Sequence, residues 1–136
     1  MPDIHTLRTR PLVYSCSGCS DAAQTANYYA LKLTQEERAE MSCIAGVGGG
    51  VPALVKQAQS GRIIWAIDGC AMHCVKACLE KVCVKPDKHI TLSDLSIKKH
   101  KHQLLDMEQA NEHWPALLVE LEKTEQSSNI TTPSAA

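Results

Sequence analysis

Short apolar runs alternate with longer amphipathic segments along the first ninety residues of the chain. Three such runs, at 11–16 (PLVYSC), 39–46 (AEMSCIAG) and 62–68 (RIIWAID), are predicted to be strands, the second of them ending near Cys43. The run at 62–68 has the continuous apolar centre that is expected of a strand buried on both faces. A fourth short strand is predicted at 88–94 (KHITLSD).

The segments between the strands have the pattern of helices. Residues 20–33 are rich in Ala, lack Gly and Pro, and place apolar side chains on one helical face, with Ser20 as the predicted N-cap. Further helices are predicted at 51–59 and 69–83.

The C-terminal third is less regular. Residues 93–106 (SDLSIKKHKHQLLD) are basic, and we expect them to be mostly exposed. Residues 107–123 predict one helix, or a helix pair broken around Pro115, and the leucines after the proline have the spacing of a face that docks on the sheet.

The order of these elements predicts the fold class. Strands that alternate with helices form a parallel sheet with right-handed crossovers and helices on both faces. We therefore expect a three-layer α/β fold, Rossmann-like or flavodoxin-like, with a mostly parallel sheet of about four strands. It would form a single domain over 11–123, preceded by an N-terminal arm (1–10) and followed by a polar, disordered tail (124–136).

Composition narrows the classes of partner. The chain has 136 residues and a formal net charge of −1, which does not favour nucleic acid or an anionic membrane surface as a ligand. No apolar run approaches the ~20 residues of a membrane-spanning helix, and the N-terminus lacks the apolar core of a signal peptide. We expect a cytoplasmic protein, with a protein partner or a homo-oligomer left open.

The seven cysteines are the strongest chemical signal. Disulfides are disfavoured in the cytoplasm, and an odd number of cysteines argues against a fully paired framework. Such thiols are expected to be buried as small hydrophobes, bound to a metal, or used in catalysis.

Four of the cysteines are predicted to meet at one place. Cys16 and Cys43 end the first two predicted strands, and Cys70 lies two residues past the third. All three therefore fall at the carboxyl edge of a parallel sheet, where such folds bind ligands. They converge if the first strand lies between the second and the third. Cys74, four residues after Cys70, would share its helical face. Four thiolates suit a tetrahedral Zn²⁺, with an iron–sulfur cluster as the alternative.

The remaining cysteines have other expected roles. Cys78 and Cys83 are predicted to pack as apolar side chains. Cys19 is a fifth candidate at the metal site. The Cys16–Cys19 pair before a helix also permits a thiol-based redox or sulfur-transfer enzyme, so whether the protein is an enzyme is left open.

Other polar groups near the thiols have structural and functional interpretations. Asp68 is expected to cap the third helix, with a role behind the metal or as a general base as the alternatives. His73 is predicted to be a half-exposed helix residue rather than a ligand or proton shuttle. The glycines of 46–50 (GVGGG) predict a tight turn before a helix rather than a phosphate cradle.

Four segments in this order resemble the DGC-domain family: YSCSGCSDAAQTAN, MSCIAGVGGGVPALV, AIDGCAMHCVKACLE and HITLSDLSIKKHKH. Together they cover about residues 13–102. The resemblance implies a zinc site formed by four signature cysteines, which fall on Cys16, Cys43, Cys70 and Cys74. It does not imply a reaction.

Overall fold

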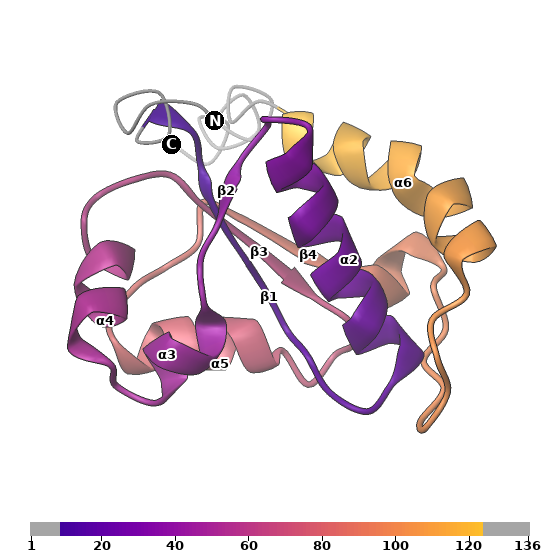
Figure 1. The fold of residues 1–136 in the computed structure, drawn as a ribbon, viewed down its shortest axis with the longest axis horizontal. Helices are drawn as coiled ribbons and strands as arrows, with labels where there is room; N and C mark the ends of the chain where they lie inside the picture. Colours follow the sequence, from indigo (N-terminus) through magenta and orange to yellow (C-terminus); the bar gives the residue numbers. More distant parts are fainter. Residues whose placement is uncertain (1–8, 124–136) are drawn as a thin grey trace, which may run out of the picture.

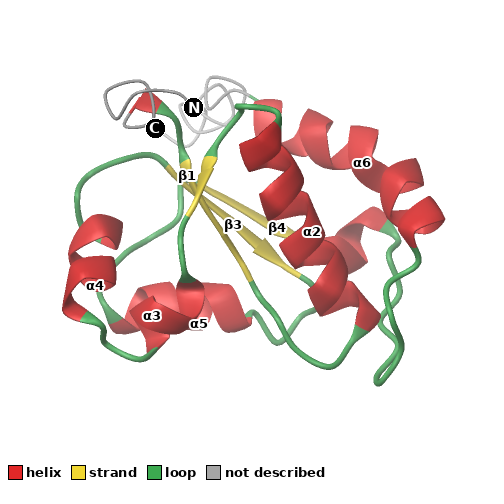
Figure 2. Cartoon of the chain, in the orientation of Figure 1, coloured by secondary structure: helices red, strands yellow, loops and turns green. Residues whose placement is uncertain are grey.

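The computed structural model describes residues 9–123 and contains a four-stranded sheet in the order β2-β1-β3-β4 (Figures 1 and 2). The strands are β1 (Leu12–Ser15), β2 (Glu40–Met41), β3 (Ile64–Asp68) and β4 (Lys88–Thr91). Every neighbouring pair is parallel, so the four carboxyl ends lie along one edge. The predicted α/β fold, with the first strand between the second and the third, is confirmed.

Helices cover both faces of this sheet. Helix α2 (Asp21–Gln35) and helix α6 (Met107–Glu122) lie on one face, while α3 (Ile44–Gly48), α4 (Pro52–Ala58) and α5 (Cys74–Lys81) lie on the other (Figure 1). A 3-10 helix, η1 (Leu92–Leu95), follows β4. The predicted tail and most of the predicted arm fall outside the described residues. No helix within 9–123 is both long and apolar enough to cross a bilayer.

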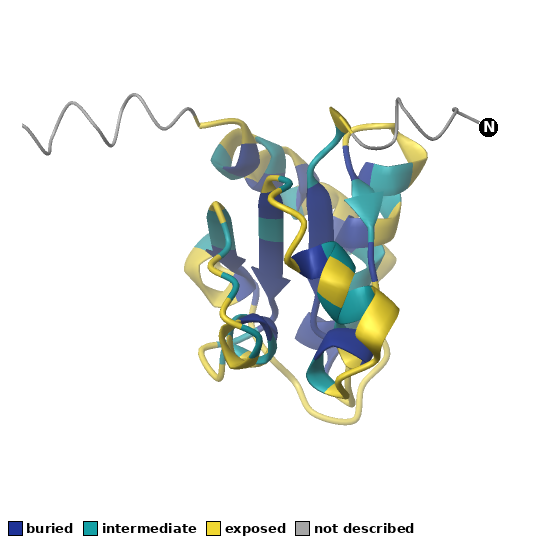
Figure 3. Cartoon of the chain, turned by 90° about the vertical axis from the view of Figure 1, so that its left-hand side faces the viewer, coloured by how far each residue is buried: buried dark blue, intermediate teal, exposed yellow. Residues whose placement is uncertain are grey.

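The core is mostly aliphatic and lies on both faces of the sheet, with α2 and α6 packed on one face and buried residues of α3, α4 and α5 on the other (Figure 3). Helix α2 buries its predicted apolar face, and the hydroxyl of Tyr29 on that face donates to the carbonyl of Ala110 at 2.7 Å. The rings of Tyr29 and Trp114 lie 5.5 Å apart. Helix α6 continues through Pro115 without a break, so the alternative of two helices is wrong.

The second predicted strand is shorter than expected, because the chain turns into α3 directly after Cys43. The first part of the glycine-rich segment is therefore helical, while Gly49 and Gly50 form the predicted turn before α4. Its glycines let neighbouring helices approach closely: a Cβ at Gly46 would lie 2.0 Å from Leu54 Cδ1, and one at Gly48 would lie 2.9 Å from Cys78 Sγ.

The third predicted helix begins at Cys74 instead of residue 69. Cys70 therefore lies in a loop, and the prediction that Cys70 and Cys74 share one helical face is wrong. The loop ends where His73 adopts a left-handed backbone conformation (φ 56°) and serves as N-cap. Because Asp68 accepts a hydrogen bond from the N–H of Val75 at 2.8 Å, its expected role as a helix cap is confirmed.

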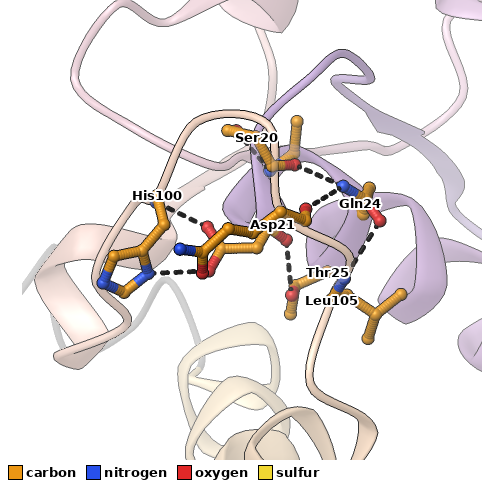
Figure 4. A network of polar contacts seen from close by, with 8 residues as sticks. Ser20, Asp21, Gln24, Thr25, His100 and Leu105 are labelled. Atoms are coloured by element: carbon orange, nitrogen blue, oxygen red, sulfur yellow. Dashed lines mark hydrogen bonds and ion pairs between the residues drawn. The ribbon is translucent and has the colours of Figure 1, made fainter.

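Residues 98–105 form a strap that is fixed to the start of α2 (Figure 4). The backbone N–H and the ring Nδ1 of His100 lie 2.6 and 2.8 Å from the two carboxylate oxygens of Asp21. The N–H of His102 donates to the carbonyl of Cys19 at 2.8 Å, and that of Leu105 donates to Gln24 Oε1 at 3.0 Å. The basic segment is exposed, as expected, yet it has a defined position beside the carboxyl edge.

The contact between Asp21 and His100 predicts an acid-sensitive step in unfolding. Burial alone would raise the pKa of Asp21, but the hydrogen bonds from His100 outweigh it and hold this pKa below its ordinary value. The carboxylate therefore stabilises the fold at neutral pH, and this contribution is lost as the pH falls through the folded-state pKa, below about pH 4. Asp21→Asn is expected to lower the free energy of unfolding by about 1–2 kcal/mol at neutral pH and by less at about pH 3.

Urea unfolding at the two pH values measures this difference. Glu120→Gln, at an exposed ion pair with Lys123, serves as the control and is expected to have little effect at either pH. Equal losses for Asp21→Asn at both pH values would contradict the assignment.

Candidate thiol site at the carboxyl edge of the sheet

The parallel strands deliver the predicted thiols to one edge of the sheet. Cys16 follows β1 directly, and Cys43 and Cys70 each lie two residues beyond the ends of β2 and β3. Cys74 is the first residue of α5, which starts at the same edge. All seven cysteines of the chain are free thiols.

Cys16 is the buried member of the set. Its Sγ accepts a hydrogen bond from the N–H of Gly69 at 3.1 Å. Burial raises the pKa of the Cys16 thiol to about 11, and the negative charges of Asp68, Cys74 and Cys70 add to the rise.

Cys70 is half-buried in the loop between β3 and α5, beneath the strap. The ammonium group of Lys99 lies 3.4 Å from Cys70 Sγ and 3.8 Å from Met72 Sδ. A cation from the strap is thus placed between two sulfur atoms of this loop.

The other two candidates are more open. Cys43 is exposed at the N-cap of α3. Cys19 is exposed in the loop between β1 and α2. Within residues 9–123, no three side chains of His, Cys, Asp or Glu are already close enough together to hold a metal ion. The thiols share an edge without forming a closed cage.

Cys78 follows Cys74 by one turn of α5, and Cys83 lies beyond the end of that helix. Cys78 is half-buried where α5 faces Gly48, and burial raises the pKa of its thiol. Cys83 is exposed, so the prediction that it packs as an apolar side chain is wrong. It lines a cavity of about 530 Å³ together with Arg62 and Ile63, which precede β3 at the amino edge of the sheet.

A layer of polar residues stands behind the loop that carries Cys70. The carboxylate of Asp68, which is 1% exposed, also accepts a hydrogen bond from the N–H of Lys76 at 3.4 Å and contacts His89 Nε2 at 2.8 Å. His73 Nε2 lies 3.1 Å from Thr91 Oγ1, and the rings of His73 and His89 meet edge to face at 4.8 Å.

Our sequence analysis missed the role of His89. The alternation in KHIT was a usable signal, because it places His89 and Thr91 on one face of β4. With this layer in place, Asp68 joins two strands to the start of α5, which carries Cys74.

The protein is a small parallel α/β domain that carries free thiols at the carboxyl edge of its sheet. More specifically, the chain belongs to the DGC-domain family, since the family's DGC domain matches residues 12–117. It is similar to "Anaerobic and virulence modulator AnvM" of Pseudomonas aeruginosa, with 53% identity over 113 residues and 83% of each chain covered. No solved structure matches the chain.

Proposed function

We propose that this protein binds Zn²⁺ through cysteine thiolates at the carboxyl edge of its sheet. The observation that supports the proposal is that Cys16, Cys70 and Cys74 lie at the carboxyl ends of parallel strands or at the start of the helix beside them, although they come from separate segments. Cys43, beyond the neighbouring strand β2, would complete a set of four. Four thiolates are a common ligand set for structural zinc, with Zn–S distances of ~2.3 Å.

The chemistry of the donors fits such an ion. The N–H of Gly69 directed at Cys16 Sγ, and the ammonium of Lys99 beside Cys70, both stabilise sulfur that carries negative charge. Cys43 and Cys74 are exposed, so their side chains are free to turn inward. Metal binding would therefore close a site whose sulfurs already share one edge.

A regulatory or sensory role is favoured over catalysis. The relative from Pseudomonas aeruginosa is named a modulator. A dithiol enzyme that uses Cys16 and Cys19 would need a reactive thiolate, but burial keeps the free Cys16 thiol protonated at neutral pH. Metal coordination would remove that proton. Free thiols of this kind also suit the reducing cytoplasm.

Metal content of the purified protein tests the proposal. Protein purified anaerobically under reducing conditions is expected to hold about one zinc ion per chain, as judged by elemental analysis. Cys16→Ser, Cys70→Ser and Cys74→Ser are each expected to weaken zinc binding by at least tenfold in a chelator competition.

One control variant sets the baseline. Cys83→Ser changes an exposed thiol away from the edge and should retain wild-type zinc affinity. Cys19→Ser is also expected to retain the metal, and loss of zinc from it would make Cys19 a ligand. Visible absorption with stoichiometric iron would identify an iron–sulfur cluster instead. The proposal is wrong if Cys16→Ser binds zinc as tightly as the wild type.

A further inference from the structure

The loop Cys70–Cys74 (CAMHC) contains a third sulfur besides its two thiols. Met72 is 72% exposed, which makes it one of the most exposed large apolar side chains within residues 9–123. A thioether in this position contributes little to the core. Because methionine is flexible and polarizable, the group is able to reach a ligand from the rim of the site.

The strap shows where such a ligand would lie. The ammonium of Lys99 lies 3.4 Å from Cys70 Sγ and 3.8 Å from Met72 Sδ, so one thiol and one thioether converge on the same monovalent cation. The ammonium therefore marks a position where a monovalent metal ion would contact both sulfur atoms.

Both ends of the loop are anchored. Asp68 holds the preceding strand against the start of α5 through the N–H of Val75. His73 is held by Thr91 and turns the chain with a left-handed φ of 56°. The loop therefore carries Met72 between two anchored ends, with Cys70 and Cys74 on either side of it in the sequence.

We propose that this loop is a site for monovalent copper, with Cys70 and Cys74 as thiolate ligands and the Met72 thioether as the third. Soft thiolate and thioether sulfurs select Cu(I), whereas zinc sites use thiolate, imidazole and carboxylate. The proposal shares Cys70 and Cys74 with the zinc site, so the two metals would compete for one edge. Met72 distinguishes between them, because the thioether serves copper alone.

Metal affinities of full-length variants test this assignment. Cu(I) affinity is measured anaerobically by competition with bicinchoninate, and Zn²⁺ affinity is measured by competition with a zinc chelator. Met72→Leu keeps the size and apolarity of the side chain but removes the sulfur. It is expected to weaken Cu(I) binding by at least tenfold and to leave Zn²⁺ affinity unchanged. Met107→Leu, at another exposed methionine, is the matched control and should leave both affinities unchanged.

The outcomes separate this inference from the proposed function. An unchanged Cu(I) affinity in Met72→Leu overturns the copper site, and so does an equal loss of Cu(I) and Zn²⁺ affinity. A wild-type protein that binds Cu(I) in a Met72-dependent way but holds no zinc overturns the zinc proposal alone.

Discussion

Asp68→Ala is expected to lower the free energy of unfolding by about 3 kcal/mol or more. The carboxylate is buried and accepts hydrogen bonds from the backbone of Val75 and Lys76 at the start of α5, while it also contacts His89. Its removal leaves three buried or half-buried polar groups without their acceptor, and hydrogen bonds to a charged group contribute about 1.5–3 kcal/mol each. Chemical denaturation with circular dichroism measures the loss.

Two further variants test whether the loss of stability comes from the hydrogen bonds of Asp68. Asp68→Asn retains one carbonyl oxygen for the N–H of Val75, so a smaller loss is expected. Asp94→Ala removes an exposed carboxylate from η1 and should change stability by no more than about 0.5 kcal/mol. If Asp68→Ala behaves like Asp94→Ala, Asp68 does not join β3, β4 and α5 as described.

Gly69→Ala is expected to destabilise the protein by about 2–3 kcal/mol or to prevent folding. A Cβ at this position would lie 2.8 Å from the carbonyl carbon of Ala22 and 2.9 Å from the backbone nitrogen of Ala23. This first turn of α2 cannot move away easily, since the N–H of Ala23 donates to the side chain of its N-cap, Ser20. The same shift would weaken the hydrogen bond from Gly69 to Cys16 and the affinity for zinc.

A substitution at Gly61 distinguishes the effect of this steric clash from the effect of backbone strain. Gly61 has φ +87° and open space around its missing Cβ, so Gly61→Ala carries only the cost of a left-handed residue, about 1–2 kcal/mol. Thermal unfolding of both variants compares the two effects. The interpretation of Gly69 fails if Gly69→Ala is as stable as the wild type.

The gathering of thiols at one edge could be predicted from the sequence because it depends on topology. Once 11–16 and 62–68 are recognised as parallel strands, the residues that follow them must lie at the same edge. The predicted stripe on α2 is confirmed for the same reason, since a helical period depends only on local spacing.

The features that the sequence did not reveal depend on contacts between distant segments. Asp21 and His100 are 79 positions apart, and Asp68 and His89 are 21 apart. The need for Gly69 arises from the backbone of α2, which no local pattern indicates. Helix α5 begins later than predicted, because the left-handed backbone of His73 interrupts the helical pattern of the residues before it.

X-ray absorption at the zinc K-edge tests the central claim most directly. For zinc-loaded full-length protein, we expect a first shell of four sulfurs at ~2.3 Å, falling to three sulfurs and one lighter atom in Cys43→Ser. A shell dominated by nitrogen and oxygen, or one that Cys43→Ser and Cys16→Ser leave unchanged, would contradict a site built from the thiols at the carboxyl edge.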